Sequence, residues 1–294
     1  MCRAYFFKSQ RQKLSLCGGF GSPDSAALFS VTRDDLPPTI KEIIMEIYTY
    51  GQDVRLKYCA SMLSANPIPF YERIILLPIP STRNGITVSG TDESLSDIIA
   101  ALLPKDILVC YELPSDARRE AVTRGAAVVD LSHDELFLEE NASLTAIGTV
   151  GRILTEQSVA PCGLHVGIIG YGRIGQHLLR LLMFMGARVR VFTTKSTLLQ
   201  ELQMLGISGA DSLSIKDSPD ESFSELNILI NTAPARVIPE SAKHSLASVR
   251  VIELASGKNI PDGITYESFP SVPKLMYPES AGIAMYKSVI RMLA

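Results

Sequence analysis

The chain has 294 residues, of which 46% are hydrophobic and 20% are charged, so it can bury a sizeable core and is not a disordered segment. Its 28 Lys and Arg residues against 31 Asp and Glu residues give a net charge of -3, which supplies no basic field for a nucleic acid. No stretch approaches the roughly 20 apolar residues of a membrane span, and the five cysteines lack metal-ligand spacing, so we expect a cytoplasmic protein with no membrane contact and no metal site.

The first half of the chain alternates helical patterns with short apolar strands. Residues 1–23 carry basic side chains and no unbroken apolar run, so we expect a first strand and a loop there instead of a signal peptide. A helix is predicted over 40–50, with Ile43, Ile44 and Ile47 on one face and a stop at Gly51. Further along, the pattern predicts strands at 73–80, 107–113 and 126–131 and helices at 95–103 and 115–124.

A second series of the same kind follows a predicted linking helix. The helix covers about 144–158, and Pro161 and Gly163 break the chain after it. The expected strands are 164–169, 188–192, 228–231 and 249–254, with helices that start near 174, 196 and 239 and a last helix over 279–293. Continuous apolar strands that alternate with helices indicate parallel sheets covered on both faces.

The strongest motif is a glycine loop between a predicted strand and a predicted helix. Gly170, Gly172 and Gly175 have the spacing G-x-G-x-x-G, and a second strand follows the helix, which is the context that a dinucleotide-binding loop requires. The first glycine permits a tight turn, the second a close approach of backbone to pyrophosphate, and the third close packing of the helix. The residues between them, also expected at the cofactor, are Tyr171, Arg173 and Ile174. An empty glycine turn is the alternative.

The end of the next strand indicates which dinucleotide fits. A site for NAD places an acid there to bind the ribose 2′-hydroxyl. This chain has hydroxyls and a lysine at that point: Thr193, Thr194, Lys195 and Ser196. Such groups suit a 2′-phosphate, so we expect NADP as the cofactor, with NAD as the weaker candidate. The alternative is a solvated strand end at which Lys195 contacts nothing.

Two further turns follow the strands at 228–231 and 249–254. Ligands lie beyond the carboxyl ends of strands in an open α/β sheet, so both turns are expected to border the nicotinamide ribose, although their polar groups would also serve to cap the following elements. The residues concerned are Asn231, Thr232, Ala233 and Pro234 in the first turn and Ala255 and Ser256 in the second. No metalloprotease, glycosidase or serine-hydrolase motif accompanies them.

The predicted fold class is therefore α/β with two domains. Residues 1–142 are expected to form an N-terminal flavodoxin-like α/β domain. Residues 143–294 are expected to form a C-terminal NAD(P)-binding Rossmann domain with a doubly wound parallel sheet. This second domain includes the linking helix 143–158 and the C-terminal helix 279–293, which can cross back to the first domain.

In their order along the chain, these motifs resemble the family of dipicolinate synthase A subunits over residues 73–293. The matching segments are 74–78, 134–149, 170–175, 231–234, 254–256 and 278–282. The Rossmann half alone is also similar to D-2-hydroxyacid dehydrogenases. Those enzymes use an Arg, a Glu and a late His, whereas this chain has Ser256-Gly257 at the Arg position and no histidine after His244.

The resemblance implies an oxidoreductase of sporulation. Its reaction would be the oxidation of a dihydrodipicolinate-type precursor to dipicolinate, pyridine-2,6-dicarboxylate, with NADP as the hydride acceptor. It also implies a partner, a flavoprotein-like B subunit, and we expect a homo-oligomer. A dicarboxylate substrate needs hydroxyls and a cation, and the candidate catalytic residues are Thr82, Arg83, Ser143, Thr145 and Ser280.

Several positions depart from the family pattern. The family opens with a strand and a Gly-Gly-Asp-x-Arg-Gln turn, for which Cys17-Gly18-Gly19 is the nearest match in the first 23 residues. Its glutamate before a Gly-Thr pair is Ile147 here, and its arginine after Ala-Ser is Gly257. Two alternatives therefore stay open. One is a non-catalytic NADP-binding relative that serves as a sensor or partner subunit, and the other is an NAD-dependent 2-hydroxyacid dehydrogenase.

Overall fold

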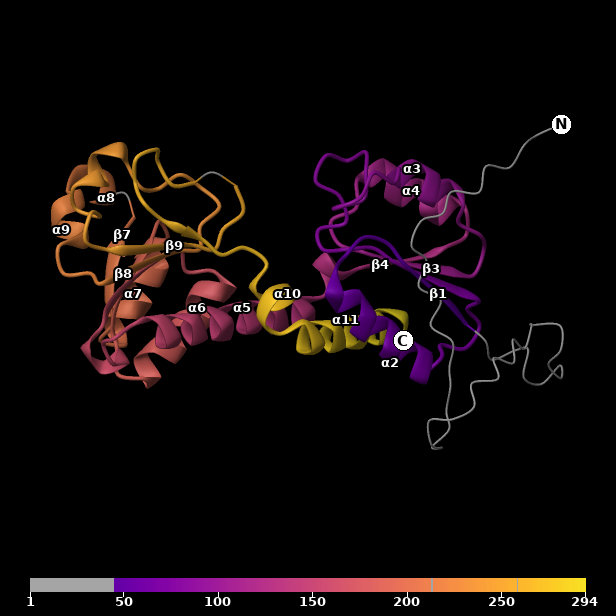
Figure 1. Ribbon diagram of the computed structural model, residues 1–294, viewed down its shortest axis with the longest axis horizontal. Coiled ribbons are helices and arrows are strands. Elements are labelled where there is room, and N and C mark those ends of the chain that lie inside the picture. The colour runs from indigo at the N-terminus through magenta and orange to yellow at the C-terminus, as the bar shows by residue number, and fades with distance from the viewer. Residues whose placement is uncertain (1–44, 213, 258) are drawn as a thin grey trace, which may run out of the picture. The chain divides into compact units, whose positions relative to one another are not determined.

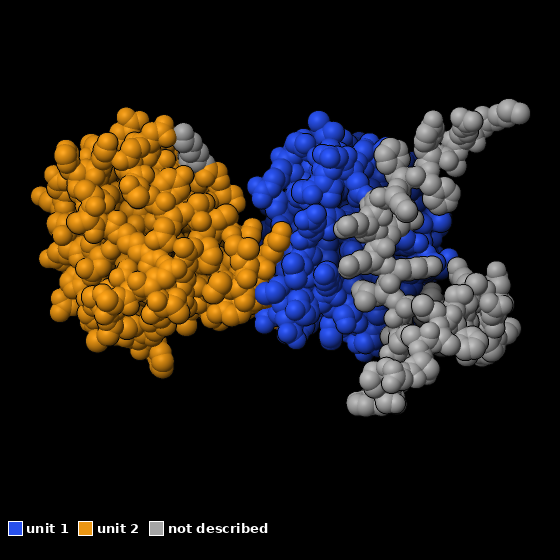
Figure 2. Space-filling view, in the orientation of Figure 1, with its two compact units in different colours: residues 1–138, 278–294 blue, residues 139–277 orange. Residues whose placement is uncertain are grey.

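The computed structural model describes residues 45–212, 214–257 and 259–294, and these fold into two compact units (Figure 1). Unit 1 is made of two segments, the described residues up to Leu138 and Pro278–Ala294, whereas unit 2 is Glu139–Tyr277 (Figure 2). Each unit contains one parallel sheet, which confirms the predicted α/β class. The strand and loop expected in residues 1–23, with Cys17-Gly18-Gly19, lie outside the described residues.

Unit 1 is a four-stranded sheet with helices on both faces. Its strands lie side by side in chain order: β1 (Glu46–Thr49), β2 (Arg73–Leu76), β3 (Asp106–Cys110) and β4 (Ala127–Asp130). Helices α2 (Val54–Ala65) and α11 (Pro278–Leu293) pack on one face, and α3 (Leu95–Ala100) and α4 (Ser115–Thr123) pack on the other. Ile74 packs in the hydrophobic cluster on one face of the sheet and its neighbour Ile75 in the cluster on the other face, which is why β2 is apolar at successive positions after Arg73.

The predicted helix over 40–50 is wrong in its described part, because Glu46–Thr49 is strand β1. This strand pairs in parallel with β2, from Glu46 opposite Arg73 to Thr49 opposite Leu76. The isoleucine spacing suits a helix locally, but pairing with a buried neighbour strand decides the conformation. Helix α2, which the sequence pattern did not indicate, begins after Asp53, whose carboxylate accepts a hydrogen bond from the backbone N–H of Arg55.

A buried ion pair fixes the turn between β1 and α2. The Arg55 guanidinium lies 2.6 Å from the Asp53 carboxylate, and both side chains are almost fully buried. The same guanidinium donates to the carbonyl oxygen of Ile79 at 3.1 Å. Such a pair is stable only when its remaining hydrogen-bonding groups are satisfied, so it ties this turn to the segment after β2.

Helix α11 packs against α2 through a glycine. A Cβ atom on Gly282 would lie 2.6 Å from the carbonyl oxygen of Arg55 and 2.5 Å from Cβ of Tyr58, so only glycine allows this approach. Arg291 of the same helix lies 2.6 Å from the Asp134 carboxylate. The observed division therefore differs from the expected one, which grouped 279–293 with the Rossmann domain.

Helix α5 (Glu135–Glu156) is longer than the linking helix expected at 143–158. It begins directly after Asp134, whose carboxylate accepts a hydrogen bond from the N–H of Leu136 at 3.1 Å. An acceptor at that position satisfies a backbone donor of the first turn, which explains the earlier start.

Unit 2 is a six-stranded sheet in the order β10-β9-β8-β5-β6-β7. Its strands are β5 (His165–Ile169), β6 (Arg188–Thr193), β7 (Ser208–Asp211), β8 (Ile228–Asn231), β9 (Arg250–Glu253) and β10 (Glu267–Ser268). The strand order reverses between β5 and β8, as it does in doubly wound dinucleotide-binding folds. The strands predicted at β5, β6, β8 and β9 are confirmed, whereas β7 and β10 were not predicted.

Helices cover both faces of this second sheet. One cluster joins it to α5, α6 (Arg173–Phe184), α7 (Ser196–Met204) and α10 (Val272–Met276). The other joins it to α8 (Ser214–Asp217), α9 (Pro219–Phe223) and a 3-10 helix, Glu240–Lys243, where the sequence predicted a helix start. This layering leaves the loops at the carboxyl ends of the strands as the place for a ligand.

The close approach at Gly282 predicts a stability change. Gly282→Ala should lower the free energy of unfolding by about 1–3 kcal/mol, because the added methyl meets backbone atoms of α2. Gly151→Ala in α5 is the matched control, since its Cβ would contact only the Tyr277 hydroxyl at 3.7 Å. The control should gain up to about 1 kcal/mol of helix propensity. Urea unfolding measures both, and a Gly282→Ala protein as stable as wild type would contradict the close contact.

Candidate functional site

Two glycines of the loop between β5 and α6 are required by contacts within the protein. Gly170 has a φ of +93°, and a Cβ atom there would lie 2.6 Å from Oγ1 of Thr232. A Cβ atom on Gly175 would lie 2.3 Å from the carbonyl oxygen of Gly170. The first glycine therefore allows the turn, and the third lets the helix lie against the loop.

Gly172 is different, because no contact among the described residues requires it to be a glycine. A Cβ atom at this position would meet none of their atoms within 4 Å. Its φ of -79° is one that any residue adopts, and it is the N-cap residue of α6, without a side-chain cap. The first backbone N–H groups of a helix lack partners within the helix, and the open space at Gly172 lies at this end of α6, where the helix dipole is positive. The residues present fit an anionic group such as a pyrophosphate.

The end of β6 lies beside the glycine loop. The N–H of Gly170 donates to the carbonyl oxygen of Phe192 at 2.9 Å, and Thr193 is buried at the last position of the strand. Beyond it three residues are exposed: Thr194, Lys195 and Ser196. An ammonium group and two hydroxyls thus follow the strand at the point where an NAD site has an acid.

The turn after β8 is bonded to the glycine loop. The N–H and the hydroxyl of Thr232 both donate to the carbonyl oxygen of Ile169, at 2.8 and 2.9 Å. The hydroxyl also donates to the carbonyl oxygen of Gly170 at 3.3 Å. These bonds hold the carboxyl ends of β5 and β8 in one arrangement on the two sides of the point where the strand order reverses.

The ends of β8 and β9 meet through two buried polar side chains. Nδ2 of Asn231 donates to the carboxylate of Glu253 at 2.9 and 3.2 Å, and the two residues are 1% and 2% exposed. Burial raises the pKa of Glu253, and the hydrogen bonds from Asn231, Asn259 and the Ala255 N–H oppose that rise. Sequence reasoning placed the two turns at the cofactor but missed this link. Its signal in the sequence was a polar residue that ends each of two apolar runs, Asn231 in β8 and Glu253 in β9.

The five residues predicted to be catalytic are divided between the units. Thr82, Arg83 and Ser280 belong to unit 1, whereas Ser143 and Thr145 belong to unit 2. The Thr82 hydroxyl accepts the Gly85 N–H at 2.9 Å within a turn, and the Thr145 hydroxyl donates to the carbonyl oxygen of Asn141 at 2.8 Å within α5. Arg83 and Ser280 are exposed. A catalytic role for this set stays a prediction.

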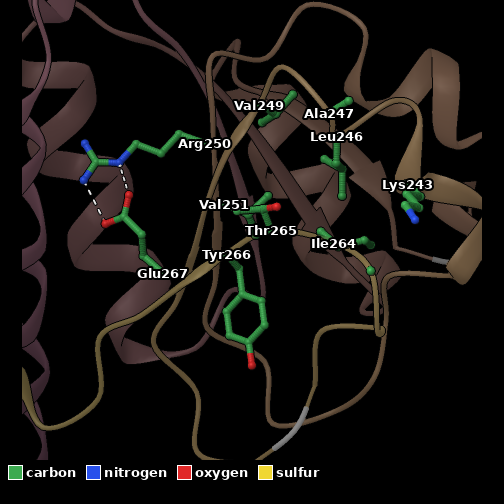
Figure 3. Close-up of a pocket in the computed structure, with 11 residues that line it drawn as sticks. Lys243, Leu246, Ala247, Val249, Arg250, Val251, Ile264, Thr265, Tyr266 and Glu267 are labelled. Carbon is green, nitrogen blue, oxygen red and sulfur yellow. Dashed lines mark hydrogen bonds and ion pairs between the residues drawn. The ribbon is translucent and has the colours of Figure 1, made fainter.

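Two cavities lie apart from all of these residues. One, of about 440 Å³ in unit 2, is lined by the first residues of β9 and the segment that leads into β10. Figure 3 shows Tyr266 and Lys243 at its wall and the ion pair of Arg250 with Glu267, whose atoms lie 2.6 Å apart. The other, of about 570 Å³ in unit 1, adjoins Gly51 and the first turn of α2. Neither is lined by a predicted cofactor or substrate residue.

In the part of the chain that the structure describes, no group of three or more His, Cys, Asp or Glu side chains is arranged to hold a metal ion. Among the helices of the described chain, none is both long enough and apolar enough to cross a membrane.

Comparison with known proteins shows the fold. No family model and no curated protein sequence matches the chain. The structure is similar to the crystal structure of the A subunit of dipicolinate synthase from Bacillus halodurans, with 20% identity, a TM-score of 0.68 and coverage of 85% of this chain and 98% of that one. The corresponding polypeptide of dipicolinate synthase from Bacillus subtilis gives 20% identity, a TM-score of 0.67 and coverage of 85% and 95%. A transhydrogenase from Sinorhizobium meliloti gives 15% identity and a TM-score of 0.55, with coverage of 75% of this chain and 73% of that one.

The open space at Gly172 generates a prediction in which stability and binding separate. Gly172→Asp should fold at least as stably as wild type, since aspartate is a favourable N-cap residue and its side chain meets no neighbour. Its carboxylate would fill the space of the pyrophosphate and repel its negative charge. NADPH should therefore bind about 100-fold more weakly, a loss of about 2.7 kcal/mol of binding free energy.

Thermal unfolding and NADPH fluorescence titration measure the two effects. Gly172→Asn is the matched control, because it adds the same bulk without the charge and should bind with an affinity between those of wild type and Gly172→Asp. Unchanged NADPH affinity in Gly172→Asp would show that the loop is an empty turn.

Proposed function

We propose that the protein is an oxidoreductase that binds a nicotinamide dinucleotide across the carboxyl ends of β5 and β8. The observation that carries the proposal is the contrast among the three glycines of the motif, because Gly172 is the one of the three at which an added Cβ would meet no atom of the described residues within 4 Å. A pyrophosphate there would accept hydrogen bonds from the first turn of α6. The adenosine end would then extend over β6 and the nicotinamide end over β8 and β9. Bound in this way, the dinucleotide supplies a hydride acceptor.

The preferred cofactor in this proposal is NADP. Support comes from the exposed side chains of Thr194, Lys195 and Ser196 after β6 and from the lack of an acid among them. An ammonium group and hydroxyls bind a phosphate dianion by charge-assisted hydrogen bonds, whereas a ribose 2′-hydroxyl gains little from a lysine. NAD is the weaker candidate.

The proposed reaction is the oxidation of a dihydrodipicolinate-type precursor to dipicolinate. It removes one hydride and one proton from the ring, and formation of an aromatic pyridine favours it. The chain therefore needs to bind and orient a dicarboxylate more than to supply a strong acid or base. In this proposal Arg83 binds a carboxylate, and the hydroxyls of Ser143 and Ser280 donate to the substrate. The hydroxyl hydrogens of Thr82 and Thr145 are used within the protein, toward Oδ1 of Asn84 and the carbonyl oxygen of Asn141, so these two oxygens act as acceptors.

Two observations support this choice of reaction. The likeness to the two dipicolinate synthase structures extends over 98% and 95% of those chains. In addition, the turn after β1 is Gly51-Gln52-Asp53-Val54-Arg55, which has the Gly, Asp and Arg of the family's opening turn at the same spacing. The expected cytoplasmic location, role in sporulation, homo-oligomer and flavoprotein-like B subunit belong to the same proposal.

A second candidate function is that of a non-catalytic NADP-binding sensor or partner subunit. Ile147, which stands where the resembling family has a glutamate, is 42% exposed on α5. An isoleucine has no ionisable group, so it cannot transfer a proton as a glutamate at that position could, which favours a non-catalytic role.

The lysine after β6 provides a test of cofactor choice. Lys195→Ala should weaken NADPH binding about tenfold or more and leave NADH binding unchanged, because only NADPH carries the 2′-phosphate. Lys243→Ala, which removes an exposed lysine from the 3-10 helix of unit 2, should change neither affinity. Paired fluorescence titrations of wild type and the two variants with NADPH and NADH measure these affinities. A wild-type protein that binds NADH as tightly as NADPH would contradict the proposed preference.

The reaction itself is tested by product formation. Purified protein with NADP+ should convert the freshly formed condensation product of aspartate semialdehyde and pyruvate to dipicolinate, followed by the ultraviolet absorbance of the pyridine. The assay is run with and without a B-type subunit, and a protein-free mixture gives the spontaneous background. No product above that background, from a preparation that binds NADPH, would contradict the reaction and favour the second candidate.

A further inference from the structure

The carboxylate of Glu253 is bonded to both of the turns expected at the nicotinamide end of the site. We propose that Glu253 is a positioning residue that holds the turns after β8 and β9 in the geometry that binds the nicotinamide half of the dinucleotide. The inference rests on the proposed function of the site and adds a specific role for a residue that contacts no cofactor.

In the turn after β8, the side chain of Asn231 bonds to the backbone of Ala233. Oδ1 of Asn231 accepts the N–H of Ala233 at 3.2 Å, and Nδ2 donates to the carbonyl oxygen of Ala233 at 3.2 Å and to both oxygens of Glu253. The orientation of the Asn231 amide is therefore set by the carboxylate beneath it. Since this amide also holds Ala233, the carboxylate determines the path of the first turn.

The second turn is held by the same carboxylate. Oε1 of Glu253 accepts the N–H of Ala255 at 2.9 Å and lies 3.5 Å from Nδ2 of Asn259. Nδ2 of Asn259 also donates to the carbonyl oxygen of Ser256 at 3.2 Å. Ala255 and Ser256, the two residues expected at the cofactor, are thereby fixed by groups that converge on Glu253.

The cost of this arrangement indicates a function. Burial of a carboxylate costs free energy unless its oxygens are hydrogen-bonded, and Glu253 is only 2% exposed. An apolar residue at this position would fill the core without that cost. The three donors bonded to the Glu253 carboxylate in the described chain belong to the end of β8 or to the segment that follows β9. We therefore infer that Glu253 serves to fix the geometry of the two turns more than to stabilise the sheet.

Glutamine at position 253 would test this role with almost no change in volume. One side-chain oxygen becomes an NH2 group, so an acceptor is lost and a donor faces either the Asn231 amide or the Ala255 N–H. The turns must then rearrange to avoid two donors in contact. The glycine loop and the end of β6 keep their own bonds, among them the one from the Gly170 N–H to Phe192.

The experiment compares a whole dinucleotide with its adenosine half. Full-length wild type, Glu253→Gln and Glu253→Asp are titrated with NADPH and with adenosine 2′,5′-bisphosphate, which has the 2′-phosphate but no nicotinamide. Glu253→Gln should bind NADPH about tenfold or more weakly and the bisphosphate as wild type does, because only the nicotinamide turns depend on the carboxylate. Glu253→Asp, which keeps both acceptors, should recover part of the NADPH affinity.

A matched control removes a carboxylate from the adjacent strand. Glu267→Gln in β10 loses its bonds to Arg250 and Arg152, which lie away from both turns, and should bind both ligands as wild type does (Figure 3). Equal weakening of both ligands in Glu253→Gln, or no weakening of NADPH, would overturn the positioning role. If wild type binds neither ligand, the proposed function fails, and this inference fails with it.

Discussion

The candidate site depends on one connected set of hydrogen bonds across the carboxyl ends of three strands. Thr232 joins the end of β8 to the glycine loop after β5, and Glu253 joins it to the turn after β9. The members are buried or half-buried, so each bond left unmade would cost more than the same bond at the surface. Thr232 and Glu253 are separate links, so a change at Glu253 acts on the turns after β8 and β9 and leaves the glycine loop its bonds to Thr232 and Phe192.

The three glycines of the motif are needed for different physical reasons. Gly170 and Gly175 are imposed by the protein's own atoms, because added Cβ atoms would collide with Thr232 and with the loop backbone. No atom of the described residues requires a glycine at position 172. Its open side at the N-terminus of α6 is the feature on which the proposed pyrophosphate site rests.

Local patterns in the sequence were sufficient for most of unit 2. The continuous apolar strands and the glycine spacing are properties of short segments, so they predicted β5, β6, β8, β9 and the loop between β5 and α6. The rule that ligands lie beyond strand ends directed attention to residues 231–234 and 255–256. Three features escaped because they depend on contacts distant in sequence. These are the strand at Glu46–Thr49, which exists by pairing with β2, the packing of Gly282 on α2, and the bond from Asn231 to Glu253.

In the proposed binding mode, the open space at Gly172 holds the pyrophosphate of a nicotinamide dinucleotide. A crystal structure of the protein with NADP+ at saturating concentration should then show pyrophosphate oxygens within hydrogen-bonding distance of the first backbone N–H groups of α6, the 2′-phosphate at Lys195, and the nicotinamide beside the turns after β8 and β9. A dinucleotide bound elsewhere on the protein, or an empty glycine loop under those conditions, would contradict it.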